Sequence, residues 1–225
     1  MKLNFKILLI ILCAGCNNST NSNTQNEASK QDSEITKKLP GQDSAVNQQS
    51  NDSATIIQHE KQLLDLSSRI LKSIKERDYA GLSKFIHPAS GVRFSLYGHI
   101  DTVSAQVISA GKLKKLGNNE QKITWGLMDG TGQPVDLSID GYFKRFVYDA
   151  DFLNAEKKAV NTFLGTGNSL NNLKEVYPGC DFTEFYFSGF DPKYSGMDWR
   201  TLRLVFKKYK DKNYLVGIVH DEWTI

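Results

Sequence analysis

The clearest pattern of hydrophobic and polar positions lies in residues 196–225. Apolar side chains occupy alternate positions along 202–207 and again along 214–220, and a lysine-rich segment at 207–212 joins the two runs. A period of two is typical of β-strands, and two such runs around a short polar segment predict a β-hairpin. A hairpin alone is only marginally stable in water. We therefore expect earlier parts of the chain to cover its apolar face.

A helical period occupies residues 56–75. Apolar positions recur there every three or four residues, which predicts a helix with one stripe facing a core. Asp78 can cap the start of a second, shorter helix, which should end at His87 because the residue before a proline disfavours the helical conformation. The stripe of the first helix consists of Ile56, Ile57, Leu63, Leu64, Leu66, Ile70, Leu71 and Ile74.

The middle of the chain alternates between short patterns of both kinds. The expected elements are strands at 92–96, 123–125 and 181–187, helices around 113–116 and 142–146, a hairpin turn at 129–132, and irregular structure at 161–179. The order of elements predicts an α+β fold, with the N-terminal helices packed on a curved antiparallel sheet and the longest hairpin at the C-terminus.

The N-terminal segment 1–15 has the layout of a secretion signal. Lys2 and Lys6 precede an apolar run, and small residues precede Cys16. The run is too short to span a bilayer as a mature helix. Residues 12–16, Leu-Cys-Ala-Gly-Cys, resemble the lipobox of bacterial lipoproteins, although Cys13 stands where that motif usually has an aliphatic residue. The alternative is an ordinary cleaved signal with a chance cysteine.

The lipobox resemblance implies that Cys16 becomes the acylated first residue of the mature protein, carrying palmitate-type chains. More than one acyl chain gives stable anchoring, so the expected location is the bacterial cell envelope, with the membrane as a partner. Asn, Ser, Thr and Gln make up more than half of residues 17–55, a composition typical of disorder. The expected organisation is a signal peptide at 1–15, a lipidated cysteine and disordered tether at 16–55, and one domain at 56–225.

Charge and cysteines narrow the functional classes. The formal net charge of +3 includes two lysines of the removable signal, which leaves 3 − 2 = +1 and argues against a nucleic-acid partner. Of the three cysteines, only Cys180 would remain free, so no intramolecular disulfide is expected. We interpret Cys180 as a packed thiol and not as a nucleophile.

Two resemblances follow from the order of these elements. Helices followed by a sheet whose longest strands come last resemble, over 56–225, the cone-shaped fold of the nuclear-transport-factor-2-like superfamily. That superfamily includes isomerases, dehydratases and non-catalytic modules, so fold does not decide function. Segments 87–97, 125–126, 142–149, 167–171, 197–199 and 220–225 resemble blocks of a family of uncharacterised exported bacterial lipoproteins, which carries no activity to transfer.

The candidate catalytic residues are His87, Arg93, His220 and Glu222. In an enzyme, a histidine and a carboxylate in one cavity would share proton transfer, with Arg93 holding an anionic substrate group. In the structural alternative, His87 satisfies a helix end, Arg93 pairs with a carboxylate and His220 closes a strand end. Neighbours on a strand point to opposite faces, so Asp221 cannot share a pocket with His220.

A carboxylate partner for His220 would therefore be Glu222 or a distant residue such as Glu184. The candidate ligand-binding residues are the aromatics Trp125, Tyr142 and Trp199, which would line a pocket unless they form core. The four histidines lack close ligand spacing, and the one Cys-x-x-Cys, Cys13 to Cys16, lies at the end of the predicted signal, so no metal is expected. Residues 165–167 lack the lysine of a phosphate cradle, and no cofactor is expected.

The sequence thus favours a lipid-anchored envelope protein with a non-catalytic domain that binds a small ligand or another envelope protein. The alternative is a small-molecule enzyme of the isomerase, dehydratase or hydrolase type, using His87 or His220 as the acid or base in a cone-shaped pocket. The deciding observation is whether a histidine and a carboxylate converge inside a pocket.

Overall fold

A computed structural model describes residues 43–165, 167 and 170–224, with the backbone alone for residues 43–52. The predicted signal, Cys16 and most of the predicted tether lie outside the described residues. The helices are α1 (Asp43–Lys75), α2 (Tyr79–Leu82), α3 (Ala110–Leu116), α4 (Ile139–Phe146) and α5 (Leu173–Val176). The strands are β1 (Val92–Ser95), β2 (Val107–Ile108), β3 (Ile123–Leu127), β4 (Pro134–Leu137), β5 (Lys157–Val160), β6 (Asp181–Phe187), β7 (Arg200–Tyr209) and β8 (Lys212–Glu222).

The predicted α+β class is confirmed. Six strands form one sheet in the order β2-β1-β8-β7-β6-β5, and β3 pairs with β4 in a second, two-stranded sheet. The expectation of a wholly antiparallel sheet is wrong in one place, because β1 runs parallel to β8. A hairpin dictates the direction of its two strands, whereas β1 and β8 are joined by a long crossover that permits the parallel arrangement.

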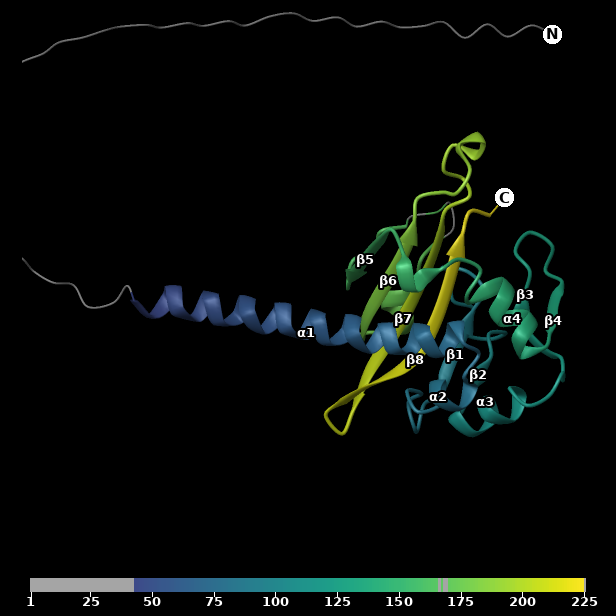
Figure 1. The fold of residues 1–225 in the computed structure, drawn as a ribbon, viewed down its shortest axis with the longest axis horizontal. Helices are drawn as coiled ribbons and strands as arrows, with labels where there is room; N and C mark the ends of the chain where they lie inside the picture. The colour runs from purple at the N-terminus through teal and green to yellow at the C-terminus, as the bar shows by residue number, and fades with distance from the viewer. Residues whose placement is uncertain (1–42, 166, 168–169, 225) are drawn as a thin grey trace, which may run out of the picture. The chain divides into compact units, whose positions relative to one another are not determined.

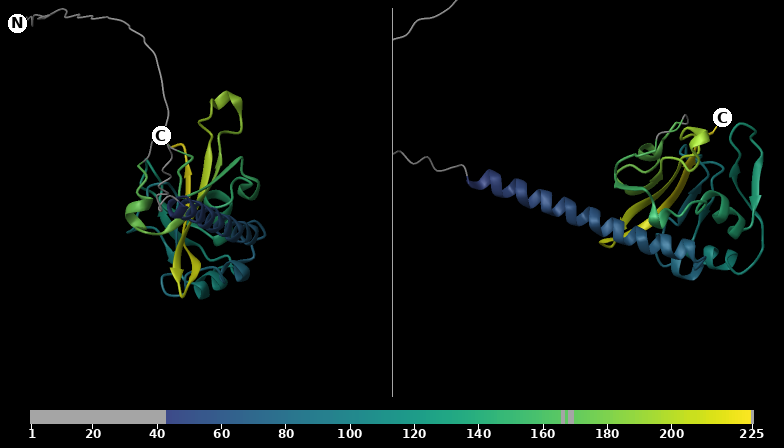
Figure 2. Two further views of the ribbon diagram at one scale, coloured as in Figure 1. Left: turned by 90° about the vertical axis from the view of Figure 1, so that its left-hand side faces the viewer. Right: turned by 45° about the horizontal axis from the view of Figure 1, so that its top comes forward.

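The predicted C-terminal hairpin is present as β7 and β8, a long twisted pair in the middle of the sheet (Figure 2). Its turn residues, Lys210 and Asp211, have φ angles of 47° and 62°. Two consecutive left-handed residues give a tight turn whose twist matches that of the strands. The lysine-rich segment therefore closes the hairpin without a longer loop.

Helix α1 begins at Asp43 and not at Ile56, so the predicted tether is helical from residue 43 (Figure 1). Ile56 and Ile57 are 59% and 66% exposed, and the buried stripe begins at Leu63. The predicted stripe was wrong at its first two positions. Extending a packed helix costs far less than nucleating a new one, so a polar segment continues it. Among the described residues, no helix is long and apolar enough to cross a bilayer.

The second predicted helix is shorter than its pattern suggested, whereas the helix expected around 113–116 is longer and spans Ala110–Leu116. Asp78 caps α2 as expected, its carboxylate accepting a hydrogen bond of 2.8 Å from the Gly81 amide, but α2 ends at Leu82. Ile86 then forms a β-bridge to Leu215 of β8. The apolar residues after α2 therefore reach the core from a turn and a bridge.

The six-stranded sheet has two covered faces. On the α1 face, the helix crosses the strands (Figure 1). The hydroxyls of Ser67 of α1 and Thr183 of β6 lie 2.8 Å apart there. The opposite face, which we call the α5 face, is covered by α5 and its flanking segments, a region predicted to be irregular. The apolar residues buried on the α5 face are Ile100, Leu173, Phe182, Val205, Val216 and Val219.

Candidate functional site

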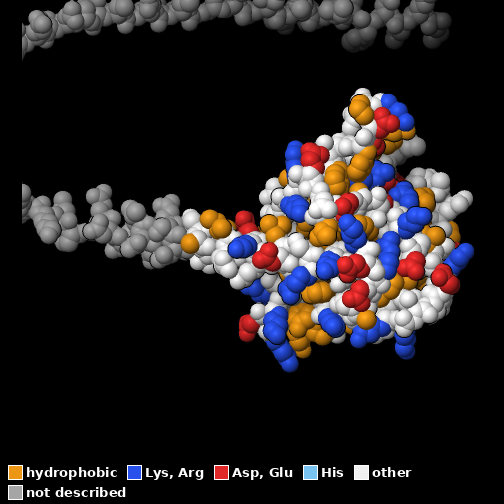
Figure 3. All heavy atoms as spheres, in the orientation of Figure 1, with side chains coloured by type: hydrophobic (Ala, Val, Ile, Leu, Met, Phe, Trp, Pro, Cys, Tyr) orange, Lys and Arg blue, Asp and Glu red, His pale blue; other side chains and the backbone are white. Residues whose placement is uncertain are grey.

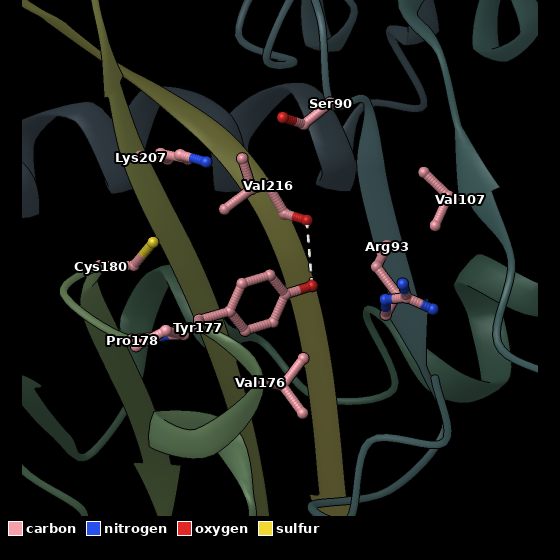
Figure 4. Close-up of a pocket in the computed structure, with 9 residues that line it drawn as sticks. All are labelled: Ser90, Arg93, Val107, Val176, Tyr177, Pro178, Cys180, Lys207 and Val216. Atoms are coloured by element: carbon pink, nitrogen blue, oxygen red, sulfur yellow. Dashed lines mark hydrogen bonds between the residues drawn. The ribbon is translucent and has the colours of Figure 1, made fainter. Parts of the chain in front are cut away.

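A pocket of about 280 Å³ lies on the α5 face, between the end of α5 and the strands β2, β1, β8 and β7 (Figure 4). Its lining is half apolar, and it contains two basic side chains, a phenol, a hydroxyl and a thiol. Neighbouring strands contribute single side chains because alternate residues point to this face. The lining residues are Ser90, Arg93, Val107, Val176, Tyr177, Pro178, Cys180, Lys207 and Val216.

The charge in this pocket has one sign. Arg93 and Lys207 line it, and no carboxylate from the described ranges does. Within the described part of the chain, neither of them forms an ion pair. Asp181, which follows the lining residue Cys180 in sequence, points to the α1 face, where it bonds His59 at 2.9 Å. On the face presented in Figure 3, by contrast, basic and acidic side chains are interspersed.

Arg93 is held in place by the backbone. Its Nη1 donates hydrogen bonds to the carbonyl oxygens of Thr102 and Ala105, at 3.1 and 3.4 Å. The structural alternative of a carboxylate partner is therefore wrong for this residue. Carbonyl groups orient the guanidinium without neutralising its charge, so a positive charge stays at the pocket.

Tyr177 and Cys180 stay protonated at neutral pH. Burial raises the pKa of Tyr177 to about 12, although the adjacent Arg93 charge opposes the shift, and the hydroxyl donates to Val216 O at 3.2 Å. Burial likewise raises the pKa of the Cys180 thiol, with Lys207 acting in the opposite direction. The thiolate is the nucleophilic form of cysteine. Cys180 thus lines the pocket as a neutral, half-buried thiol.

His220 lies on the α1 face, away from this pocket. Its ring is fully buried, with Nδ1 at 3.1 Å from Leu96 O and Nε2 at 3.2 Å from Oδ2 of Asp149. A carbonyl can only accept, so Nδ1 carries a hydrogen. Asp149 was not among the predicted partners, because it follows α4 and no local pattern connects it with β8.

Glu222 shares this neighbourhood but bonds to arginines. Its carboxylate forms ion pairs with Arg145 at 2.6 Å and with Arg200 at 3.2 Å. Nε of Arg200 also donates a hydrogen bond of 2.8 Å to Asp149. The ligand atoms of Asp149, His220 and Glu222 lie within 4.8 Å of one another. Two guanidinium groups already occupy both carboxylates, so the arrangement is an ion-pair network in which a cation would compete with arginine.

Asp221 points to the opposite face from His220, as its position on the strand requires. It bonds the fully buried Arg203 at 3.1 Å, and Arg203 also bonds Glu184 at 2.8 Å. Arg203 Nη2 donates to Gly165 O at 2.9 Å. Glu184 is therefore not a partner of His220, and these three charged residues form a second, internal network.

His87 also has a local role. Its Nδ1 accepts hydrogen bonds from the amides of Ala89 and Ser90, at 3.2 and 2.9 Å, within the turn that precedes β1. Burial lowers the pKa of its imidazole, and the Lys207 charge adds to this shift. The neutral ring satisfies a turn and not a helix end, and no carboxylate bonds to it in the described structure.

The three candidate ligand-binding aromatics are packed side chains. Trp125 and Tyr142 stack with ring centroids 4.0 Å apart, and the Trp125 indole donates to Leu137 O at 2.9 Å. Trp199 is buried beside Tyr186. None of them lines the pocket on the α5 face. Lys207 and Tyr177 do line the pocket, but the sequence did not single them out. Lys207 is part of a basic run, and Tyr177 is an aromatic residue next to Pro178.

No protein-family model, no curated protein and no solved structure matches this chain. The two resemblances seen in the sequence therefore stay predictions.

Proposed function

We propose that this protein is a lipid-anchored component of the bacterial cell envelope whose folded domain is a non-catalytic binding module. The anchor is supported by the signal-like segment 1–15 and by Cys16 after small residues. The binding role is supported by one observation above all. The α5-face pocket offers positive charge and apolar walls but no acid–base pair.

The rival enzyme hypothesis has one observation in its favour. His220 and Asp149 lie within hydrogen-bonding distance, as a general base and its orienting carboxylate would. Their surroundings favour a structural role. The His220 ring is fully buried, and Arg200 neutralises Asp149. Proton transfer to a substrate requires a histidine nitrogen that faces the substrate, and both nitrogens of His220 already face protein acceptors.

The anchor is tested by Cys16→Ser, with Cys13→Ser as the matched control. Wild type and Cys13→Ser should sediment with membranes, and the mass of their N-terminal peptide should include acyl chains. Cys16→Ser should lose the acyl mass and leave the membrane fraction after a salt wash. Unchanged mass and sedimentation for Cys16→Ser would contradict the anchor.

Binding and catalysis are separated by incubating the full chain, made as Cys16→Ser, with mixtures of small metabolites. Ligand-observed NMR should detect binding partners, and the spectra should show no new product after prolonged incubation. His220→Gln is the companion variant. Turnover that disappears in His220→Gln, at an unchanged melting temperature, would establish the enzyme hypothesis instead.

A further inference from the structure

We propose that the pocket on the α5 face binds a small monocarboxylate with an apolar body, held by Arg93 and Lys207. This inference rests on the proposed binding function and names its ligand class. The first argument is charge. Two cations without a carboxylate beside them attract an anion, and they disfavour cationic ligands by direct repulsion.

The second argument is the placement of donors. Figure 4 shows the Lys207 amine and the Ser90 hydroxyl directed toward the middle of the pocket, over Val216, with Arg93 across the Tyr177 hydroxyl from them. Ammonium and guanidinium groups form charge-assisted hydrogen bonds with carboxylates, which are stronger than bonds between neutral groups. Because carbonyls hold Arg93 in advance, little side-chain entropy is lost when a ligand binds.

The third argument is the apolar wall. Val107, Val176, Pro178 and Val216 contribute about half of the lining residues, and they offer no hydrogen-bond donors to additional ligand oxygens. Inorganic phosphate would leave this wall unused, whereas a hydrocarbon or aromatic group would cover it. The volume of about 280 Å³ is close to the lower end of the usual range for small-molecule sites. A short-chain or aromatic monocarboxylate meets each condition.

Calorimetry on the full chain, made as Cys16→Ser, tests the assignment at low salt with hexanoate and phenylacetate. Hexanamide and phenylacetamide are the matched neutral probes, and inorganic phosphate is the anion without an apolar body. A carboxylate should bind at least about tenfold more tightly than its amide, as a charge-assisted bond implies. Phosphate should bind more weakly than either carboxylate.

Lys207→Gln should weaken carboxylate binding about tenfold. Lys208→Gln is the control, because Lys208 is also exposed but its side chain leaves the strand on the other face. Arg93→Lys keeps the charge and loses the planar donor fork, so it should weaken binding while its melting temperature reports any damage to the fold. The Lys207 side chain forms no hydrogen bond or ion pair with the residues that the structure describes, which keeps the test independent of folding.

Three results with the carboxylate probes would overturn the assignment: equal affinity for carboxylate and amide, equal affinity of wild type and Lys207→Gln, or no saturable carboxylate binding. Phosphate binding as tight as carboxylate binding would also overturn it. These outcomes leave the broader binding function standing if other metabolites bind in the NMR screen. Conversion of a probe to product would instead contradict the non-catalytic function itself.

Discussion

Nε2 of His220 lies 3.2 Å from Oδ2 of Asp149, although 71 residues separate them in the chain. The contact joins β8, an inner strand of the sheet, to the segment that follows α4. Arg200 of β7 donates to the same carboxylate oxygen. Asp149 thus accepts hydrogen bonds from side chains of two strands, β7 and β8. It thereby fixes the segment that follows α4 to the end of the β7–β8 hairpin.

Asp149→Asn should destabilise the fold. The amide keeps the size of the side chain but removes the negative charge that His220 and Arg200 share, and the expected loss in the free energy of unfolding is about 2–3 kcal/mol near neutral pH. Urea denaturation measures it. Asp211→Asn is the control, because asparagine suits the left-handed conformation of this exposed turn position.

The Asp149 effect should depend on pH. Burial acts to raise the pKa of this carboxyl, but the hydrogen bond and charge of His220, together with Arg200, hold the pKa below the usual 3.8. The stabilisation by Asp149 is therefore present above pH 3.8, and it is lost as the pH falls through the lower pKa that this carboxyl has in the folded state. The difference between wild type and Asp149→Asn should narrow under acid conditions. A gap that widens on acidification would contradict this account.

Arg203→Met should be among the most damaging single changes. It would leave the buried carboxylates of Glu184 and Asp221 without their cation, at a cost of about 3–5 kcal/mol. Arg145→Gln is the comparison, since Arg145 is about half exposed and its pair with Glu222 should contribute no more than about 1 kcal/mol.

The deficit of Arg203→Met should shrink on acidification. Burial already raises the pKa of Asp221, and the Arg203 charge opposes that rise. Without Arg203 the charged carboxylate is disfavoured further, so the fold loses most stability where Asp221 is ionised and recovers some where it is protonated. Equilibrium unfolding at about pH 5 and at about pH 7.5 measures this difference. If Arg203→Met lost the same stability at both pH values, the result would be inconsistent with buried, unpaired carboxylates.

Tyr142→Phe should stabilise the protein. The Tyr142 hydroxyl is buried without a hydrogen-bond partner among the described residues, and removing such a group recovers up to about 1 kcal/mol. Tyr79→Phe is the opposite case, because the Tyr79 hydroxyl donates to Asp140 and its loss should cost about 1 kcal/mol. Thermal and urea unfolding of both variants should show shifts of opposite sign.

Ile57→Ala and Ile70→Ala should differ sharply although both positions belong to the helical pattern. Ile57 is exposed on α1, so its replacement should change stability by less than about 0.5 kcal/mol. Ile70 is fully buried, and its replacement should cost about 2–5 kcal/mol. Similar losses at both positions would mean that the exposed part of α1 is covered by something in solution.

The hairpin, the α4 helix and the capping role of Asp78 could be predicted from sequence because each depends on residues close together in the chain. The burial of Arg203 could not. It alternates with Leu202 and Leu204, and that alternation suggests a solvated face until the α5 segment is known to cover it. The partner of His220 was equally inaccessible, since only the tertiary fold brings Asp149 to β8.

The position of β8 bears on the order of folding events. It is made after every other strand of the six-stranded sheet, yet it lies between β1 and β7. While the ribosome is still adding residues 212–222, β1 and β2 have no edge to join, and the sheet exists in two separate parts. Contacts between strands so distant in sequence form slowly. The domain therefore closes only after synthesis has passed β8, and until then β1 and β7 each keep an unpaired edge on the side that β8 later joins.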